Sequence, residues 1–521
     1  VLWLSPFYPS PQDDNGYDIA DYQDVDPVFG SLADLDELIA EAHTRGLKIV
    51  LDLVVNHTSD EHPWFVESRS STENPKRDWY WWRPGAPDKA PNNWQSAFSG
   101  PAWDYDDLTG EWYLHLFSRK QPELNWENPE VRQAVHAMMN WWLDRGADGF
   151  RMDVVNLLSK VPGLPDGALI DGGPFGHPWP HVAGGPRLHE FLQEMHRAVF
   201  AGRDRPLLTV GEMPGVTVAD ARAHTDPANG EVDMVFQFDH VSVVPDKWAG
   251  AKPTPLGLKE SFGRWQSGLA DVGWNSLYLS NHDQPRSVSR FGDDSPQFRV
   301  ASACALATVL HLHRGTPYVY QGDELGMTNA PFATIADYRD IESIGYHGYQ
   351  TGRRERADIE VLAEIAQVSR DHARTPMQWD ASPDAGFTTG EPWIAVNPNH
   401  TTVNAVAART DPSSVWHHYR RLIALRHDLP VVALGDFTML LPDHPSVYAF
   451  TRRLDDVELL VVANLSSAPV TVDGLPTGGE LLMVTGGPGT DPSVLQPWEA
   501  RIHRRSPTHA AAVPRQAAID A

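Results

Sequence analysis

The sequence has little cysteine and little positive charge. Its one cysteine in 521 residues, Cys304, lies in an apolar segment. A single cysteine excludes disulfide bonds within the chain, and we expect a reducing, cytoplasmic location. Only 42 lysine and arginine residues face 69 aspartate and glutamate residues, which gives a formal net charge of -27. Nucleic acids and anionic membranes bind positively charged surfaces, so we expect neither as a partner.

Long apolar runs are absent as well. No run approaches the roughly 18 residues that would predict a membrane-spanning helix, and no signal peptide leads the chain. In contrast, 41% of the residues are hydrophobic and 19 are tryptophan, which is enough for a large buried core. The length predicts a large catalytic-type domain accompanied by smaller ones.

Short β-branched segments alternate with amphipathic helical segments through the first four hundred or so residues. After the opening residues "VLWLS", the predicted strands are 47–55, 147–155, 206–212, 232–238, 274–280 and 316–322. Alternating strands and helices predict a parallel sheet of the α/β class, and their number favours a (β/α)8 TIM barrel. Such a barrel needs eight strands and the segments number seven, so we infer that a first βα unit is missing from this chain.

Two connections are too long for ordinary loops, and the C-terminal pattern differs from the rest. Residues 56–128 are rich in Trp, Pro and Asn, and residues 326–376 are charged. Inserts of this length in compact domains are usually functional. We assign residues 1–55 and 129–430 to the barrel, 56–128 to an inserted subdomain after the third strand, 431–505 to a C-terminal all-β domain and 506–521 to a tail.

Polar residues follow the predicted strands regularly. They are Asn56 and His57, Arg151 and Asp153, Glu212, His282 and Asp283, and Asp323 and Glu324. The C-terminal ends of barrel strands meet on one face, so these residues should share a pocket. Any one of them alone is more often a capping or core residue, but all of them together predict an active site.

The residue types in this pocket point to glycoside chemistry. Several carboxylates converge without a catalytic cysteine, a glycine-rich phosphate loop or a serine elbow. In a retaining mechanism one carboxylate attacks the anomeric carbon and a second, about 5 Å away, protonates the leaving oxygen. Arg151 would keep Asp153 ionised and oriented. His57 and His282 lack the paired spacing of zinc ligands and suit hydrogen bonds to sugar hydroxyls.

The chain resembles the α-amylase family of glycoside hydrolases. Within that family it resembles the oligo-1,6-glucosidase and α-glucosidase group. The matching motifs are "GYDIADY", "DLVVNHTS", "QPELN", "GFRMDVVN", "TVGEMPGVT", "SNHDQPR" and "ARTPMQWD". The resemblance implies that Asp153 is the nucleophile, Glu212 the general acid/base and Asp283 the carboxylate that stabilises the transition state. The pKa of Asp153 should then stay low, and that of Glu212 should be higher.

The resemblance also implies roles for binding residues. Asp18 and Arg374 would hold the far hydroxyls of the terminal glucose, and Tyr17 would stack on that sugar. His57, Arg151 and His282 would bind its hydroxyls or the nucleophile. In similar enzymes, valine directly after the nucleophile accompanies α-1,6 activity, and here that residue is Val154.

The expected activity is therefore that of a retaining, exo-acting α-glucosidase that hydrolyses terminal α-1,6 bonds of short oligosaccharides, with α-1,4 bonds as a further candidate. A trehalose- or sucrose-acting hydrolase, mutase or isomerase is the alternative among enzymes. A non-catalytic relative of transporter heavy chains is the alternative from another class. We expect no cofactor and no bound metal in this chain, since the family's calcium-type loop would precede Val1. Oligomeric state is not predicted.

Overall fold

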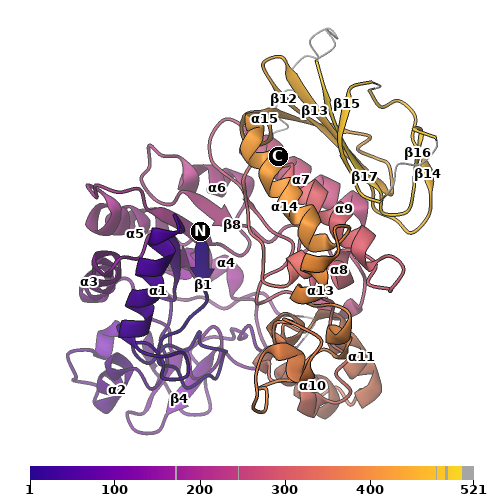
Figure 1. Cartoon of the computed structure of the whole chain (residues 1–521). Helices are drawn as coiled ribbons and strands as arrows, with labels where there is room; N and C mark the ends of the chain where they lie inside the picture. The colour runs from indigo at the N-terminus through magenta and orange to yellow at the C-terminus, as the bar shows by residue number, and fades with distance from the viewer. Residues whose placement is uncertain (171–172, 245, 477, 487–490, 507–521) are drawn as a thin grey trace.

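The computed structural model describes residues 1–506, except 171–172, 245, 477 and 487–490. It contains an α/β domain built on parallel strands and a C-terminal antiparallel β domain (Figure 1). The predicted α/β class and the predicted C-terminal β domain are confirmed. Of the predicted tail, residues 507–521 lie outside the described residues.

Seven parallel strands form the centre of the α/β domain. They are β1 (Leu2–Leu4), β2 (Ile49–Leu53), β6 (Gly149–Met152), β7 (Leu208–Glu212), β8 (Met234–Phe236), β9 (Ser276–Leu277) and β10 (Thr316–Pro317). The first five form one sheet in this order, and β9 pairs with β10. An isolated bridge between Val235 and Asn275 connects the two groups. The last two strands are shorter than predicted, because regular pairing covers only two residues of each.

The sheet is open between its first and last strands. Among the described residues, β1 pairs only with β2, and β10 pairs only with β9. A cavity of about 1000 Å³ lies between these two edges, and its lining includes Trp3 of β1 and Thr316 of β10. The strands thus follow chain order around the domain, with one opening.

Helices alternate with these strands. They are α1 (Leu32–Thr44), α3 (Pro129–Arg145), α5 (Leu188–Met195), α6 (Val218–Thr225), α7 (Pro255–Gly268), α9 (Arg299–His311) and α14 (Val415–Asp428). Local sequence sets their ends. The side chain of Asn128 caps α3 directly before Pro129, and Gly146 ends that helix with a positive φ of 122°. The Asn128 side chain accepts a hydrogen bond from a free backbone N–H at the start of the helix, and glycine adopts the positive φ at its end at little steric cost.

Gly149, the first residue of β6, allows the neighbouring strand to approach closely. A Cβ atom here would lie 1.9 Å from the carbonyl oxygen of Leu208 on β7, and the φ of Gly149 is 149°. No other residue fits this position. On its other edge β6 pairs with β2, and this pairing sets Arg151 opposite Asp52.

The two long inserts lie at the same end of the molecule (Figure 1). The first holds α2 (Pro63–Ser70) and the antiparallel strands β3 (Trp82–Pro84), β4 (Trp103–Asp106) and β5 (Glu111–Leu114). The second holds α10 (Ile341–Gly352), α11 (Asp358–Val368) and α12 (Asp371–Arg374). They meet where the Arg370 guanidinium lies 4.9 Å from the centre of the Phe98 ring.

The C-terminal sheet packs against the helices of the α/β domain. Its strands are β11 (Asp436–Leu440), β12 (Val447–Leu454), β13 (Val457–Asn464), β15 (Glu480–Val484) and β17 (Ala500–Arg505). Tyr448 of β12 and His313, just after α9, form a buried hydrogen bond of 3.1 Å. Within the described part of the chain, no helix combines the length and the apolar character needed to cross a membrane.

Candidate active site

Arg151 lies at the centre of a buried ionic cluster. Its Nη1 is 2.9 Å from Asp52 Oδ1 and 2.8 Å from Asp153 Oδ1, and its Nη2 is 2.6 Å from Glu212 Oε1. The Arg151 side chain is 1% exposed. A buried charge is tolerated only when it is paired and hydrogen-bonded. This pairing explains why the apolar segment 147–158 contains an arginine and an aspartate.

Asp52 was not identified from the sequence. It lies in the middle of β2, fully buried, and accepts hydrogen bonds from Tyr17 Oη at 2.8 Å and Trp3 Nε1 at 3.1 Å. The available signal was a lone carboxylate within the apolar run "IVLDLVV". Like Arg151 in its own strand, a charged group there needs a buried partner of opposite charge. Asp52 orients both Arg151 and Tyr17 toward the carboxylates.

Asp153 and Glu212 meet although they come from different strand ends. Asp153 directly follows β6, and Glu212 is the last residue of β7. Burial and the adjacent Glu212 carboxylate raise the pKa of Asp153 well above its ordinary value, and the opposing effect of Arg151 is smaller. The expected low pKa of Asp153 is therefore wrong for this arrangement.

Val154 has an unusual backbone conformation. Its φ is 34°, in the left-handed region that β-branched residues rarely adopt. Its N–H donates a hydrogen bond of 3.2 Å to Glu212 Oε2. Strain of this kind amounts to about 1–3 kcal/mol and persists only where the surroundings impose it. Here the strained conformation directs the Val154 N–H toward the Glu212 carboxylate.

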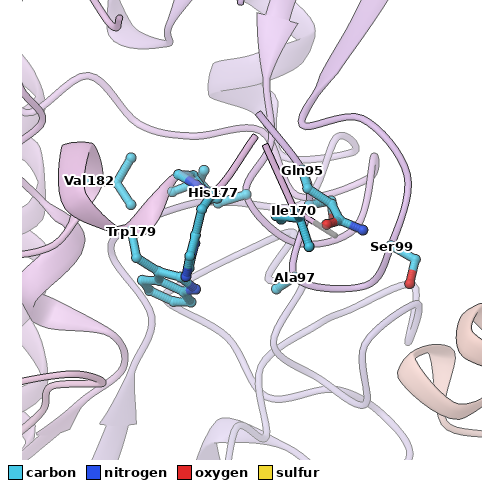
Figure 2. A pocket seen from close by; sticks show the side chains of 10 residues that line it. Gln95, Ala97, Ser99, Ile170, His177, Trp179 and Val182 are labelled. Atoms are coloured by element: carbon cyan, nitrogen blue, oxygen red, sulfur yellow. The ribbon is translucent and has the colours of Figure 1, made fainter. Parts of the chain in front are cut away.

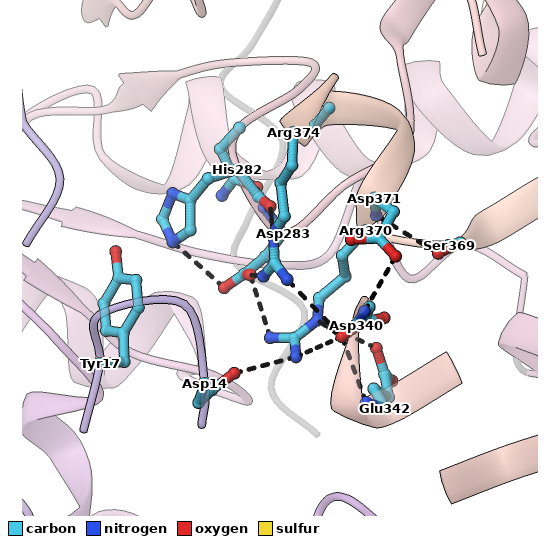
Figure 3. Close-up of polar contacts among 12 residues, drawn as sticks. Asp14, Tyr17, His282, Asp283, Asp340, Glu342, Ser369, Arg370, Asp371 and Arg374 are labelled. Carbon is cyan, nitrogen blue, oxygen red and sulfur yellow. Dashed lines mark hydrogen bonds and ion pairs between the residues drawn. The ribbon is translucent and has the colours of Figure 1, made fainter. Parts of the chain in front are cut away.

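The third carboxylate, Asp283, is surrounded by cationic groups (Figure 3). Its oxygens lie 3.3 Å from His282 Nε2, 3.1 Å from Arg370 Nη1 and 2.8 Å from Arg374 Nη2. Burial opposes ionisation of Asp283, but His282, Arg370 and Arg374 together lower its pKa well below the ordinary value. Asp283 is thus charged at neutral pH.

The structure does not bring Asp18 into this cluster. Its carboxylate accepts hydrogen bonds from Ser10 Oγ and from the N–H groups of Asp13 and Asp14, at 3.0, 2.8 and 3.1 Å. Asp18 therefore holds the loop together and has no free oxygen to offer to a sugar. The expectation that it binds substrate is corrected on this ground.

Asp14 occupies the position expected of Asp18. Its Oδ1 lies 3.1 Å from Arg370 Nη2, and its Oδ2 accepts a hydrogen bond of 3.1 Å from Gln121 Nε2 of the "QPELN" motif. The pair of Asp14 and Arg370 borders Asp283 (Figure 3). Asp14 stands three residues before Tyr17 in the same motif, so the signal was present in the sequence.

Arg374 is in the site, but its contacts differ from the expectation. Its Nε donates to the carbonyl of His282 and its Nη2 to Asp283, at 3.0 and 2.8 Å. The arginine that pairs with Asp14 is Arg370, one helical turn earlier. Arg374 therefore contacts Asp283, and the contact with Asp14 belongs to Arg370.

The remaining predicted sugar-binding residues, Tyr17, His57 and His282, lie in the site, whereas Asp323 accepts hydrogen bonds from Ser280 and Ser287 instead. The Tyr17 ring stacks on the His282 ring, with centroids 5.0 Å apart and planes 10° apart. His57 is buried, with its Nε2 3.3 Å from Gln121 Nε2. Burial lowers the pKa of His57, so the imidazole is neutral at physiological pH. Neutral imidazoles both donate and accept hydrogen bonds, as sugar hydroxyls require.

A fully buried ion pair fixes the segment that follows the nucleophile candidate. Lys160 Nζ lies 2.9 Å from Glu123 Oε2, and neither side chain is exposed. Glu123 also accepts a hydrogen bond of 3.0 Å from Asn56 Nδ2. The first insert is thereby connected to the loops after β2 and β6.

A second, smaller cavity of about 220 Å³ lies where the first insert meets the loop after β6 (Figure 2). Its lining includes Leu116 from the insert and Trp179 and Val182 from the loop. Leu116 and Val182 belong to the apolar cluster that also contains Val154. Nothing in the sequence pattern predicted this cavity.

A nucleophile candidate paired with an acid/base candidate, with a third charged carboxylate nearby, defines a glycoside hydrolase. The chain belongs to the α-amylase family. Residues 1–435 match the family model described as alpha amylase, catalytic domain, and residues 437–487 match maltogenic amylase, C-terminal domain. The predicted family and enzyme class are confirmed.

Relatives with several activities are similar to this chain. It is 51% identical to an oligo-1,6-glucosidase of Parageobacillus thermoglucosidasius over 97% of this chain and 91% of that one. The trehalose-6-phosphate hydrolase structure of Bacillus licheniformis matches with a TM-score of 0.90 and 41% identity, over 97% and 92% of the two chains. The trehalulose synthase structure of Pseudomonas mesoacidophila matches with a TM-score of 0.90 and 42% identity, over 96% and 91%.

Proposed function

We propose that the protein is a retaining, exo-acting α-glucosidase that hydrolyses terminal α-1,6-glucosidic bonds of short oligosaccharides, with α-1,4 bonds as secondary substrates. The observation that carries this proposal is the contact of one guanidinium, that of Arg151, with both Asp153 and Glu212. Among the relatives described above, the one with the highest identity is an oligo-1,6-glucosidase, and its name supports the α-1,6 linkage.

The reaction proceeds in two displacements. Asp153 attacks the anomeric carbon while Glu212 donates its proton to the leaving glycosidic oxygen, and a glucosyl-enzyme ester forms. Glu212, now a carboxylate, removes a proton from water, which attacks the same carbon and releases glucose with retained configuration. Asp283 stays ionised throughout and stabilises the positive charge that develops on the sugar ring. The three carboxylates and Arg151 account for the chemistry, so we propose that it needs no cofactor.

The ion pair of Asp14 and Arg370 forms the closed end of the pocket in this proposal. Both side chains are nearly buried, at 7% and 8% exposure, and they would bind the hydroxyls farthest from the scissile bond. A closed end admits only the terminal glucose, which explains exo action. The linkage to Gln121 and Asp283 fixes the pair in place.

A pair of variants tests whether Asp14, and not Asp18, binds the sugar. We expect Asp14→Asn to lower kcat/KM on isomaltose about 10–100-fold, because a charge-assisted hydrogen bond to the sugar contributes about 1.5–3 kcal/mol. Asp18→Asn should lower the melting temperature, since it weakens the loop, and should reduce kcat/KM less. A larger kinetic loss for Asp18→Asn than for Asp14→Asn would restore the original assignment.

Val154 supports the α-1,6 preference. The side chain is 6% exposed and packs with Trp81 and Leu157, and it follows the nucleophile candidate directly. Its branched side chain narrows the side of the site where α-1,6 and α-1,4 substrates diverge.

We expect a higher kcat/KM on isomaltose than on maltose. In Val154→Ala this preference should shrink by about tenfold, because one or two methyl groups in a binding site change discrimination by 1–3 kcal/mol. Both ratios come from initial rates on the two disaccharides. A wild-type preference for maltose would contradict the linkage assignment.

The finer architecture is part of the proposal. The seven parallel strands form seven eighths of a (β/α)8 barrel, which is open between β1 and β10 and carries an inserted subdomain in residues 56–128. The carboxylates then lie at the C-terminal strand ends, where barrel enzymes hold their active sites. A cytoplasmic location stays a prediction from the single, buried Cys304.

The alternative enzymes, which act on trehalose or sucrose, would use the same three carboxylates on a different substrate. Trehalose- and sucrose-acting enzymes are represented by the two solved structures described above. Parallel assays on isomaltose, maltose, trehalose, trehalose 6-phosphate and sucrose decide between them, and isomaltose should be hydrolysed fastest. The absence of hydrolysis of all five would favour the non-catalytic alternative.

A further inference from the structure

Two histidines and a glutamate meet at a place separate from the active site. They are His189 on α5, His224 on α6 and Glu231 in the loop before β8. Their ligand-type atoms all lie within 4.8 Å of one another. None of the three takes part in the reaction described above, and the sequence pattern did not single them out.

The Glu231 carboxylate is the centre of this group. Its side chain is fully buried, and its two oxygens are shared between the imidazoles. Oε1 lies 2.8 Å from His189 Nδ1, and Oε2 lies 2.6 Å from His224 Nδ1. Gln193 Nε2 donates a further bond of 3.1 Å to Oε1. A buried carboxylate with this set of donors is ionised and fixed in orientation.

The two imidazoles stack on each other, with ring centroids 4.6 Å apart and planes 26° apart. Both therefore present Nδ1 to the same carboxylate. The His224 side chain is 4% exposed, whereas that of His189 is 52% exposed. His189 thus connects a buried carboxylate and a buried imidazole to solvent.

From this geometry we propose that His189, His224 and Glu231 bind a divalent first-row transition metal ion, of which Zn²⁺ is the best fit. Two imidazole nitrogens and one carboxylate oxygen form a ligand set that Zn²⁺ uses in proteins. Each imidazole would bind through Nδ1 and carry its proton on Nε2. A fourth position faces solvent beside His189 and takes a water molecule.

The required movement is small. Ligand atoms in a tetrahedral zinc site are separated by roughly 3.3 Å, since each lies about 2.0–2.1 Å from the ion. With one ligand atom from each residue, the three atoms lie within 4.8 Å of one another, which is within about 1.5 Å of that distance. Rotation of the partly exposed His189 side chain provides most of the change. The proposal differs from the expectation that this chain binds no metal.

The site should stabilise the fold and not serve the reaction. Glu231 precedes β8, so it lies at the N-terminal end of the sheet, whereas Glu212 ends β7 at the opposite edge. In barrel enzymes catalysis is confined to the C-terminal edge. A metal ion would connect α5 to α6 and to the entry of β8, and the last two are already joined by a backbone hydrogen bond of 3.2 Å from Val232 N–H to the carbonyl of His224.

The test is metal binding by the full chain after removal of metals with a chelator. Co²⁺ should give the visible absorption of a site with nitrogen and oxygen ligands, and Zn²⁺ should abolish it. Competition with a chromophoric chelator should show one equivalent of Zn²⁺ that His189→Asn loses. We expect this variant to bind at least about 100-fold more weakly, since even changes at the partners of a ligand weaken binding roughly 10–100-fold.

His189→Asn keeps a hydrogen-bond donor near Glu231, and its unchanged melting temperature without metal would show that it folds. His427→Ala, on the exposed side of α14, is the matched control and should bind like the wild type. Zn²⁺ should raise the melting temperature of the wild type and of this control, but not that of His189→Asn. Equal binding by His189→Asn and the wild type, or no binding by the wild type, would overturn the proposal.

Discussion

Asp153→Asn is expected to lower kcat on isomaltose by a factor on the order of 10⁴ or more, because the amide cannot form the glucosyl ester. The fold should be preserved. Burial and Glu212 both raise the pKa of Asp153 and so oppose a charge at this position, which means that a neutral amide of the same shape should be tolerated. The measurements are single-turnover and steady-state rates, together with the melting temperature.

Asp107→Asn is a suitable control for this variant, because Asp107 is an exposed carboxylate in a turn of the first insert. It should keep the wild-type rate. If Asp153→Asn retained as much as a tenth of the wild-type rate on an unactivated disaccharide, Asp153 could not be the nucleophile.

Glu212→Gln should separate substrates by their leaving groups. On isomaltose we expect kcat/KM to fall by about 10²–10⁴-fold, the usual contribution of a positioned general acid. A 2,4-dinitrophenyl α-glucoside needs little protonation to leave, so its glucosylation rate should fall far less. An equal loss on both substrates would mean that Glu212 acts by shaping the site and not as an acid.

The same variant should change the pH dependence in a definite direction. The Glu212 carboxylate contributes to the raised pKa of Asp153, second to burial. Removing its charge should lower that pKa, so the reactive carboxylate form of Asp153 persists to lower pH. The acid limb of kcat/KM on the aryl glucoside should therefore move to lower pH in Glu212→Gln. A move to higher pH would contradict the proposed coupling of the two groups.

The sequence predicted the parts of the site that depend on strand ends. Asp153, Glu212 and Asp283 each end or follow a strand of a parallel α/β fold, and such ends meet on one edge whatever the loops do. Arg151 could be predicted as their partner, because a guanidinium in an apolar strand needs a carboxylate. The alternation of strands and helices was sufficient for these inferences.

The parts that depend on loop geometry could not be predicted. Asp14 and Asp18 share one loop, and positive φ values of 53° at Asn15 and 94° at Gly16 break any regular side-chain alternation between them. Spacing alone therefore does not tell which carboxylate faces the pocket. Likewise, Arg370 and Arg374 lie one helical turn apart, and their partners depend on how the second insert packs against the loop after β9.

The charge states were the least predictable feature. The expectation of a low pKa for Asp153 rested only on Arg151, its neighbour along the strand. Two further effects, the burial of Asp153 and the proximity of Glu212, arise only in the folded sheet and both raise this pKa. For Asp283 the effect of burial is outweighed by three basic neighbours, and two of them, Arg370 and Arg374, come from a distant insert.

The central claim is that Asp153 forms the covalent intermediate of a retaining α-glucosidase. The most direct measurement traps that intermediate with a 5-fluoro-α-glucosyl fluoride, which forms the ester faster than it is hydrolysed, and locates the label by peptide mass spectrometry. We predict one fluoroglucosyl group per chain, on Asp153, and none in Asp153→Asn. A label on another residue, or no label from an active enzyme whose first product is β-glucose, would contradict the account.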